Sequence, residues 1–559
     1  MAKMRCGVAA VEALRAAGVT KVFGLMGSST LEIYDALYDA KDMEYIGVRH
    51  ENCGMHMADA YGRMTQTPGL FMCGQAGPGS ANMVLGLAQA KMAYSPVVAI
   101  TGLPSTEHLG RDAFQEIDQN TLFLPVTKRV MTVPRPERIP EFILEAFRIA
   151  NSGRRGPVVV NIPRDLLNHD IDVDMPRAGS PGIAPAADRA TLEKIRQMIL
   201  AAKAPVIHAG AGIKWARASE KLVRLAEKLQ IPITNSAGHA DVVPCDHPLY
   251  AGGMGPRGNA VASTLMREAD LVLALGTRLG FNTTFYKYTD ISKTAKIVQV
   301  DIDPIALGRY FPVDLGIAAD AGAVVEALAE IMAPIAPETA PWRARNEKFR
   351  MDYQELWRER EASAAATGKP PHPDVIYSEL RKAAPRDAIF TLDAGTTGFQ
   401  ATDQLPCKTV PSLITPLDCG MVGFSYAAGL GAQVAAPQRT VISLMGDGGF
   451  GMTMGEMSTA VMHNINAIAL VMDNGTWGSE IAYQRDFFSH RYIGAHVHSP
   501  RFDEVMKLCG GNGYFVTEAG GTAEAIRQAM AGGKPAVIHV KVDPEAVVSF
   551  RKDALKKRD

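Results

Sequence analysis

The sequence predicts an α/β fold of three doubly wound parallel-sheet domains, and three observations support this prediction. The chain has 559 residues, which is too long for one compact core and suits about three domains of ordinary size. Short β-branched segments alternate with longer helical patterns, as in repeated βαβ units. Two breaks rich in small residues, glycine and proline divide this series, at 177–186 and at 331–373, the second around a charged helical segment. We therefore expect domains at residues 1–178, 188–333 and 370–559.

Each expected domain contains candidate strands that are short, apolar and rich in β-branched residues. They are 97–100 and 158–162 in the first domain, 271–275 and 297–300 in the second, and 389–392, 441–445, 467–472 and 536–540 in the third. Helical patterns separate them along the chain. We therefore expect each set to form a parallel sheet covered by helices.

The composition is that of a soluble globular protein, with 47% hydrophobic and 21% charged residues. The formal net charge is −1, so no overall field favours nucleic acid or an anionic membrane. No uninterrupted apolar segment approaches the ~18 residues of a membrane-spanning helix, and the first residues do not resemble a signal peptide. The seven cysteines are scattered and never spaced as CxxC, which argues against a disulfide framework or a zinc site. We expect a cytoplasmic protein that binds neither nucleic acid nor a membrane.

The most informative motif is Gly446-Asp447-Gly448, followed after 24 residues by Asp473-Asn474-Gly475-Thr476-Trp477. Each part follows a candidate strand, 441–445 or 467–472, so both are expected at the carboxyl ends of parallel strands. Open α/β sheets bind their ligands at that edge.

The residue types of this motif suit a diphosphate bridged by a metal. The glycines allow the backbone to approach a phosphate and to direct amide groups at it. Asp447 is a hard carboxylate ligand suited to Mg²⁺, with the Asn474 side chain and the Thr476 main-chain carbonyl as further oxygen ligands. The alternative is a pair of unrelated glycine turns, and the strand contexts and the spacing argue against it.

Two other segments each allow two interpretations. Gly210-Ala-Gly212, after a candidate strand of the second domain, is either a structural turn or part of a site for FAD, ADP or CoA. The basic tail that contains Arg551 and Lys552 is either a solvated chain end or a flap over an anionic substrate.

The motif at 446–477 resembles that of the thiamine diphosphate enzyme superfamily, which has GDG and a terminal asparagine at about this spacing. Many members have two asparagines where this chain has Asp473-Asn474. The resemblance implies that the third domain binds the cofactor diphosphate and the first its pyrimidine, around a Rossmann-like central domain. It also implies a cofactor shared between two subunits, hence a homodimer or a dimer of dimers. The cofactor contacts that it implies in the third domain are Gly446, Asp447, Gly448, Gly449, Asn474, Thr476, Trp477 and Gly478.

The first domain carries a second resemblance to this superfamily. Glu51, within an HE…AxAYGR pattern, matches the carboxylate that hydrogen-bonds the aminopyrimidine ring and promotes its imino tautomer. Gly77 and Asn82 belong to a segment similar to the GPG…N turn at the dimer interface. An isolated glutamate on a helix usually lies on a solvated face, but the pattern that surrounds Glu51 favours the catalytic role.

A third resemblance covers Cys419-Gly420-Met421-Val422. In the superfamily this segment bends the cofactor into a V shape. The resemblance implies that the Val422 side chain lies beneath the bend, and that the Gly420 carbonyl and the Val422 amide pair with the pyrimidine. The alternative is a core packing role for Val422.

Across nearly its whole length the chain resembles the acetolactate synthase-like group. The segment around Phe114 and Gln115 and the later Lys128 are similar to substrate-facing elements of that group, and Gln115 is a candidate catalytic residue. Within the group, the segment from Asn474 to Glu480 and the ending at 550–555 resemble the sulfoacetaldehyde acetyltransferase family.

That resemblance implies a reaction in which sulfoacetaldehyde and phosphate give acetyl phosphate and sulfite. Lys128, Arg551 and Lys552 are candidates to recognise the sulfonate or the phosphate. Glu480 is a candidate acid or base, and a solvent-facing position is the alternative.

Other functions stay open. Ala76 stands where the sulfoacetaldehyde acetyltransferase family has asparagine. A 2-hydroxyacyl-CoA lyase or oxalyl-CoA decarboxylase, which yields formyl-CoA, is the alternative, with the basic tail and Arg257 or Arg278 as contacts for the CoA phosphates. An acetolactate synthase-type carboligase is a further alternative. A binding protein that only keeps the fold is disfavoured because Glu51, Asp447 and Asn474 are all present.

Overall fold

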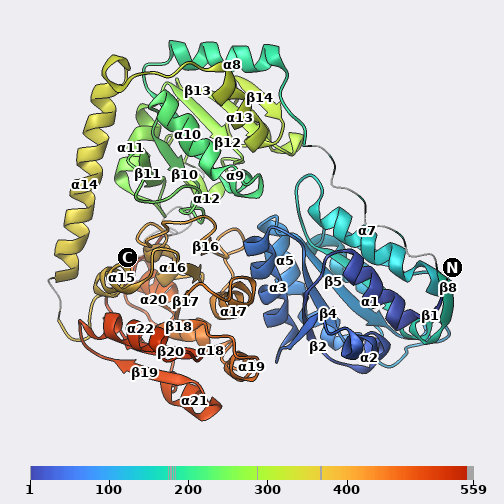
Figure 1. Cartoon of the computed structure of the whole chain (residues 1–559). Helices are drawn as coiled ribbons and strands as arrows, with labels where there is room; N and C mark the ends of the chain where they lie inside the picture. The colour runs from blue at the N-terminus through green and yellow to red at the C-terminus, as the bar shows by residue number, and fades with distance from the viewer. Residues whose placement is uncertain are drawn as a thin grey trace.

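The computed structural model describes residues 2–550, apart from 174, 175, 177, 178, 180, 181, 183, 286, 366 and 367. The described chain contains three six-stranded parallel sheets with helices packed around them (Figure 1). This confirms the predicted fold class. The C-terminal tail with Arg551 and Lys552 lies outside the described residues.

The N-terminal sheet has the strand order β3-β2-β4-β5-β7-β6. Its strands are β2 (Lys21–Leu25), β3 (Glu44–Gly47), β4 (Gly69–Cys73), β5 (Val97–Leu103), β6 (Arg129–Thr132) and β7 (Val158–Pro163). Its longer helices are α1 (Cys6–Ala16), α2 (Leu31–Asp39), α3 (Glu51–Thr65), α5 (Val84–Met92) and α7 (Ile139–Asn151). The central strands β4, β5 and β7 are buried along their whole length, as expected for a parallel sheet covered on both faces. An antiparallel pair, β1 (Ala2–Arg5) and β8 (Asp170–Val173), lies outside this sheet.

The central sheet has the order β11-β10-β9-β12-β13-β14. Its strands are β9 (Pro205–Ala209), β10 (Ile233–Asn235), β11 (Tyr250–Gly253), β12 (Leu271–Leu275), β13 (Lys296–Asp301) and β14 (Leu315–Ala318). The helices include α8 (Arg189–Ala201), α9 (Ala211–Trp215), α10 (Ser219–Leu229), α11 (Ala260–Glu268), α12 (Phe281–Thr284) and α13 (Ala321–Ile331). Helix α10 buries Leu222, Leu225, Ala226 and Leu229, the spacing of one apolar helix face.

The C-terminal sheet has the order β16-β15-β17-β18-β20-β19. Its strands are β15 (Ile389–Leu392), β16 (Leu413–Ile414), β17 (Val441–Gly446), β18 (Ile468–Asp473), β19 (Asn512–Val516) and β20 (Ala536–Lys541). Its helices are α15 (Pro373–Ala383), α16 (Thr396–Ala401), α17 (Ser425–Ala435), α18 (Asp447–Gly451), α19 (Glu456–Met462), α20 (Gly478–Phe487), α21 (Phe502–Cys509) and α22 (Gly521–Ala531). Every strand expected from the sequence in the three domains is present.

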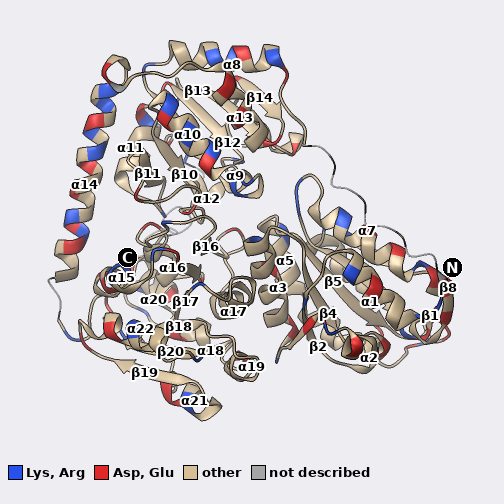
Figure 2. Ribbon diagram, viewed as in Figure 1, with Lys and Arg blue, Asp and Glu red and all other residues tan. Residues whose placement is uncertain are grey.

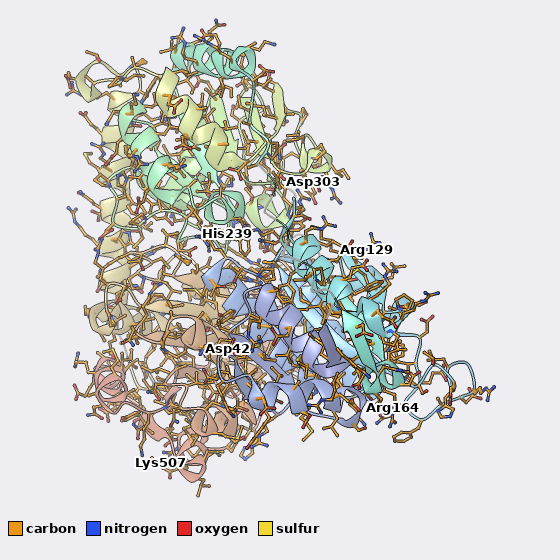
Figure 3. The ribbon with its side chains drawn as sticks, turned by 45° about the vertical axis from the view of Figure 1, so that its right-hand side comes forward. Asp42, Arg129, Arg164, His239, Asp303 and Lys507 are labelled. Atoms are coloured by element: carbon orange, nitrogen blue, oxygen red, sulfur yellow. The ribbon has the colours of Figure 1, made fainter. Side chains whose placement is uncertain are left out.

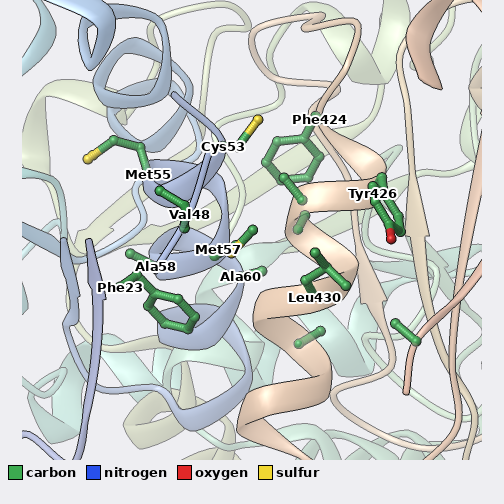
Figure 4. Close-up of a cluster of buried hydrophobic side chains, with 14 of the residues drawn as sticks. Phe23, Val48, Cys53, Met55, Met57, Ala58, Ala60, Phe424, Tyr426 and Leu430 are labelled. Carbon is green, nitrogen blue, oxygen red and sulfur yellow. The ribbon is translucent and has the colours of Figure 1, made fainter. Parts of the chain in front are cut away.

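The N-terminal and C-terminal sheets are joined through α3 and α17, which pack against each other in a shared apolar core (Figure 4). The helices approach closely because small residues face the contact. A Cβ atom at Gly431 would lie only 2.1 Å from the Met57 carbonyl oxygen. Arg63 of α3 also pairs with Asp59 and donates to the Thr415 carbonyl. The start of α3, which carries Glu51, is therefore fixed relative to the C-terminal sheet.

The long helix α14 (Arg343–Ala365) runs along the outer edge from the central to the C-terminal sheet (Figure 1). Lysine and arginine alternate with acidic residues along it (Figure 2). Pairs such as Arg343 and Glu347, with Nε and Oε1 2.8 Å apart, are typical of an exposed helix face. Among the described helices, none combines the length and apolar content needed to cross a membrane.

Candidate active site

The two parts of the GDG…Asn motif lie side by side, as predicted. Strand β17 ends at Gly446 and strand β18 at Asp473, and the two strands pair in parallel with Gly446 opposite Met472. Asp447 begins α18, and Asn474 follows β18 directly. Because both strands end at the same edge of the sheet, their following loops share one site.

The Asp447 carboxylate fits a metal ligand. It is 1% exposed, and its Oδ2 accepts a hydrogen bond from Ser499 Oγ at 2.7 Å. Its Oδ1 is buried and has no hydrogen-bond partner among the described residues. Burial, together with the nearby Asp473 charge, raises the pKa of Asp447 to about 6. A buried carboxylate oxygen without a donor costs free energy that a bound cation offsets.

The rest of the donor set is oxygen from neutral groups, which suits Mg²⁺. Asn474 Oδ1 already accepts the Thr476 amide at 3.0 Å, which turns the loop back toward Asp447. No cluster of three or more His, Cys, Asp or Glu side chains able to hold a metal occurs among the described residues. A site with one carboxylate, one amide oxygen and one main-chain carbonyl is not such a cluster.

Asp473, which replaces the usual first asparagine, has basic partners on β20. Its Oδ2 accepts hydrogen bonds from His539 Nε2 at 2.7 Å and from Lys541 Nζ at 2.6 Å. Burial acts to raise the pKa of Asp473, but these partners prevail and lower it to about 2. The negative charge that Asp473 brings in place of an asparagine is thus paired with two basic side chains. The spacing of the sequence did not predict this pairing.

A cavity of about 490 Å³ lies next to this motif. Of the predicted residues, its lining contains Gly420, Val422, Gly446, Gly448, Gly449, Asn474, Thr476, Trp477, Gly478 and Glu480. Two of these glycines are required for space, since a Cβ at Gly448 would lie 2.6 Å from the Trp477 ring and one at Gly449 would lie 2.2 Å from Asp393 Oδ2. The C-terminal segment closes one side, where Phe550 stacks on Phe399 with ring centroids 5.2 Å apart.

Asp393, which the sequence analysis missed, holds the segment that contains Val422. Asp393 directly follows β15 and lines the same cavity. Its carboxylate accepts the amides of Gly423 and Phe424, each at 2.8 Å. The available signal was the one that identified Asp447, namely a carboxylate directly after a buried strand. Burial raises the pKa of Asp393 to about 6, although the amide donors partly oppose this.

This shift predicts a pH effect on stability. A carboxyl whose pKa is higher in the folded than in the unfolded protein binds more protons when folded. Its contribution to the free energy of unfolding is then present at low pH and lost as pH rises from about 4 to 6, by at most about 3 kcal/mol. Denaturant unfolding of the unloaded protein should show this loss together with the one expected from Asp447, and Asp393→Asn should remove the part that Asp393 contributes. An unchanged pH dependence in Asp393→Asn would contradict the assignment.

The predicted residues of the N-terminal domain form a second group. Glu51 begins α3, is 6% exposed, and accepts a hydrogen bond from Asn82 Nδ2 to its Oε2 at 2.9 Å. Gln115 Oε1 accepts from Gln75 Nε2 at 2.7 Å. Gly77 has a φ of +55°, and a Cβ there would lie 2.4 Å from the Gln115 carbonyl oxygen. Glu51, Gly77, Asn82 and Gln115 are therefore held in one local framework.

Within one chain the two groups do not line the same cavity. All described lining residues of the cavity next to the GDG motif lie between 257 and 550, so Glu51 is not among them.

Two predicted substrate residues line neither described cavity. Phe114 is 87% exposed. Lys128 donates from Nζ to the main-chain carbonyls of Ile149 and Ser152 at the end of α7, and it lines neither described cavity. Burial lowers the pKa of Lys128 to about 8. Their substrate roles stay predictions.

A larger cavity, of about 1030 Å³, lies between the N-terminal and central sheets. Gly210 and Gly212 line it, and a Cβ at Gly212 would lie 2.5 Å from Gly276 Cα, so close packing of two turns already requires glycine there. Arg154 pairs with Asp301 and Asp303 at 2.9 Å each. Figure 3 labels His239, which lines the cavity, and Asp303.

Family models match the three parts of the chain in order. They are the N-terminal TPP binding domain at residues 4–122, the central domain at 192–328 and the C-terminal TPP binding domain at 393–540 of the thiamine pyrophosphate enzymes. Thiamine pyrophosphate is thiamine diphosphate under its other name. The fold and the site thus define a thiamine diphosphate-dependent enzyme.

Relatives that match nearly the whole chain show which enzymes of this class the protein is similar to. The chain is 34% identical to a sulfoacetaldehyde acetyltransferase of Alcaligenes xylosoxydans xylosoxydans, over 99% of this chain and 96% of the relative. It is 33% identical to a sulfoacetaldehyde acetyltransferase of Castellaniella defragrans, over 98% of this chain and 94% of the relative. It is 32% identical to a probable acetolactate synthase large subunit of Methanocaldococcus jannaschii, over 97% of this chain and 92% of the relative. The chain belongs to the thiamine pyrophosphate enzyme family, in the superfamily that contains these transferases and synthases.

Proposed function

We propose that the protein is a Mg²⁺-dependent acetyltransferase that converts sulfoacetaldehyde and phosphate into acetyl phosphate and sulfite. The observation that carries the proposal is the cavity next to the GDG motif. The segment from Asn474 to Glu480, on which the resemblance to sulfoacetaldehyde acetyltransferases depends, forms its wall. Arg257 is the one cationic side chain among the described lining residues, beside the carboxylates Asp393, Asp418, Glu480 and Asp543, and it is therefore the candidate contact for an anionic substrate.

The residues divide into those that hold the cofactor and those that act beside it. Asp447, Asn474 and the Thr476 carbonyl would hold Mg²⁺, and the glycine amides at 446–449 would hold the diphosphate. When bound, thiamine diphosphate supplies a nucleophilic C2 carbon. Glu51 would hydrogen-bond the aminopyrimidine, and Val422 would support the bend of the cofactor. Glu480 lines the cavity and is exposed in the single chain, and in this proposal it would exchange a proton with the substrate.

A homodimer, or a dimer of dimers, follows from this proposal. Within one chain, Glu51 does not line the cavity next to the GDG motif. A second copy would bring its own Glu51, Gly77, Asn82 and Gln115 to that cavity. Phe114, exposed beside this group, would then be available for an apolar contact.

The substrate is tested by product analysis of the protein loaded with thiamine diphosphate and Mg²⁺. Sulfoacetaldehyde plus phosphate should give acetyl phosphate and sulfite in equal amounts. Parallel reactions with a 2-hydroxyacyl-CoA, with oxalyl-CoA and with pyruvate test the alternatives. Formation of formyl-CoA or acetolactate, with no acetyl phosphate, would replace the proposed function by the corresponding alternative.

Arg257 predicts the kinetic signature of anion recognition. Its guanidinium donates to the Asn282 side chain and lies over the Phe285 ring, 5.3 Å from the centroid, so its position is fixed. Arg257→Ala should raise KM for sulfoacetaldehyde about 10- to 100-fold, the value of a charge-assisted hydrogen bond. Arg154→Ala removes an arginine that lines only the other cavity, where it pairs with Asp301 and Asp303, and it should leave KM nearly unchanged. Equal effects of both variants would contradict this role.

We further propose that the larger cavity binds a nucleotide, with FAD, ADP and CoA as the candidates. Its volume and the Asp301 carboxylate at the end of β13 suit an adenosine moiety. The matching nucleotide should raise Tm with increasing concentration, whereas adenine alone should not. If none of the three raises Tm, the glycines at 210 and 212 serve the turn alone.

A further inference from the structure

Helix α19 of the C-terminal domain contacts the turn that precedes Glu51. The Glu456 side chain, 1% exposed, lies at the first residue of this helix. Its Oε1 accepts the amides of Arg49 at 3.0 Å and of His50 at 3.1 Å, and its Oε2 accepts the Thr459 hydroxyl at 2.7 Å. These amides belong to the two residues immediately before Glu51.

Further contacts hold the same turn from the same helix. The Gly47 amide donates to His463 Nε2 at 3.0 Å, and Arg49 Nε donates to Ser458 Oγ at 2.9 Å. His50 is the N-cap of α3, and its Nδ1 accepts the Asn52 amide at 3.1 Å. Hydrogen bonds thus hold the backbone amides on both sides of Glu51, at residues 47, 49 and 50 before it and at residue 52 after it.

A packing role does not account for Glu456. Burying a carboxylate is costly unless hydrogen bonds compensate it, and an apolar side chain fills the same space without that cost. In the part of the chain that the structure describes, no ion pair involves Glu456. Its charge is compensated by amide and hydroxyl donors, and burial raises its pKa. The acceptor geometry is therefore the property that only a carboxylate provides here.

We propose that Glu456 is a positioning residue for Glu51: it holds residues 47–50 so that the Glu51 carboxylate is directed at the aminopyrimidine of the cofactor. This inference rests on the proposed role of Glu51. Glu456 also follows Asp447 by nine residues, from 447 to 456. The segment that begins with the proposed metal ligand therefore ends at the residue that contacts the turn before Glu51. One segment then connects the diphosphate and pyrimidine functions of the chain.

The first test uses amide hydrogen exchange in the unloaded protein. In Glu456→Ala, the amides of Arg49 and His50 should exchange about tenfold faster, the effect of losing roughly one buried hydrogen bond each. Glu456→Gln, which keeps one acceptor oxygen, should show a smaller increase. The matched control is Glu379→Gln. Glu379 is also a buried glutamate, and it accepts the amides of Gly520 and Ala523 on the far side of the domain. Unchanged exchange at residues 49 and 50 would overturn the proposal.

The second test is a double-mutant cycle with Glu51→Gln. The readout is the rate of hydrogen–deuterium exchange at C2 of bound thiamine diphosphate, which needs no substrate. Glu456→Ala should slow this exchange about tenfold or more when Glu51 is present, and should have little further effect in the Glu51→Gln background.

The outcomes of the cycle are distinguishable. An equal slowing in both backgrounds would mean that Glu456 acts independently of Glu51, and the positioning role would be wrong. If Glu51→Gln itself leaves C2 exchange unchanged, the proposed role of Glu51 fails, and the positioning role fails with it. If Glu456→Ala does not fold, the same cycle is measured with Glu456→Gln.

Discussion

Glu51→Gln is expected to lower turnover about 10²- to 10⁴-fold while leaving the fold intact. The amide has nearly the size of the carboxylate and can still accept from Asn82, but it cannot share a proton with the aminopyrimidine. Steady-state rates at saturating cofactor measure the loss. Thermal unfolding of the unloaded variant should match that of the wild type. Glu51→Ala should be at least as inactive.

Asn82 provides a graded comparison for Glu51. Its Nδ2 donates to Glu51 Oε2 at 2.9 Å, so Asn82→Ala removes an orienting contact and not the acid itself. We expect a loss of about tenfold, the effect of roughly one hydrogen bond. Turnover that survives unchanged in Glu51→Gln would exclude the proposed mechanism.

Asp447→Ala is expected to weaken the binding of Mg²⁺ and thiamine diphosphate together, by about 100-fold or more. Loss of a direct metal ligand should exceed the 10- to 100-fold effect of removing a supporting contact. Calorimetric titration measures both affinities. Trp477, in the cavity wall beside Gly448, offers a fluorescence signal for the same event.

The unloaded Asp447→Ala protein separates binding from folding. Because Asp447 Oδ1 is buried without a donor among the described residues, its removal should leave stability unchanged or slightly increased. Asp447→Asn is the variant of matched shape. A large loss of stability without cofactor would indicate a structural role.

Mixing the two inactive variants tests the shared site. If Glu51 and Asp447 of different subunits meet, a mixed dimer of Glu51→Gln and Asp447→Ala chains contains one intact site. Random mixing should then restore about one quarter of wild-type activity, since half of the dimers are mixed. No recovery after verified subunit exchange would place both residues in the same chain's site.

The sequence was sufficient to predict the fold class, eight of the strands and the position of the GDG motif. Buried strands are marked by local composition, and parallel strands end at one edge of a sheet. Asp447 and Asn474 follow such strands, so their proximity could be predicted without coordinates. Glu51 and Asn82 are joined by a hydrogen bond, and their roles toward the cofactor stay predictions.

Other features depend on contacts between distant segments. Asp393 holds the Val422 segment through amides about 30 residues away, and its place after a strand marks a candidate site residue but does not show which amides it accepts. Lys128 lies at the end of α7 because the carbonyls of Ile149 and Ser152 are nearby in space. Neither relationship has a fixed spacing that a sequence pattern could show.

The sequence by itself determined the three-domain α/β architecture, because strand composition is a local property, and its GDG…Asn motif carries the resemblance to thiamine diphosphate enzymes that the family models confirm. Only the tertiary structure decided that the Glu51 group lies outside the cavity of the GDG motif, and that Glu456 reaches the turn before Glu51. The contact of α19 with the turn before α3 joins segments more than 400 residues apart in the chain, from His50 to Glu456, because hydrogen bonds act between neighbours in space.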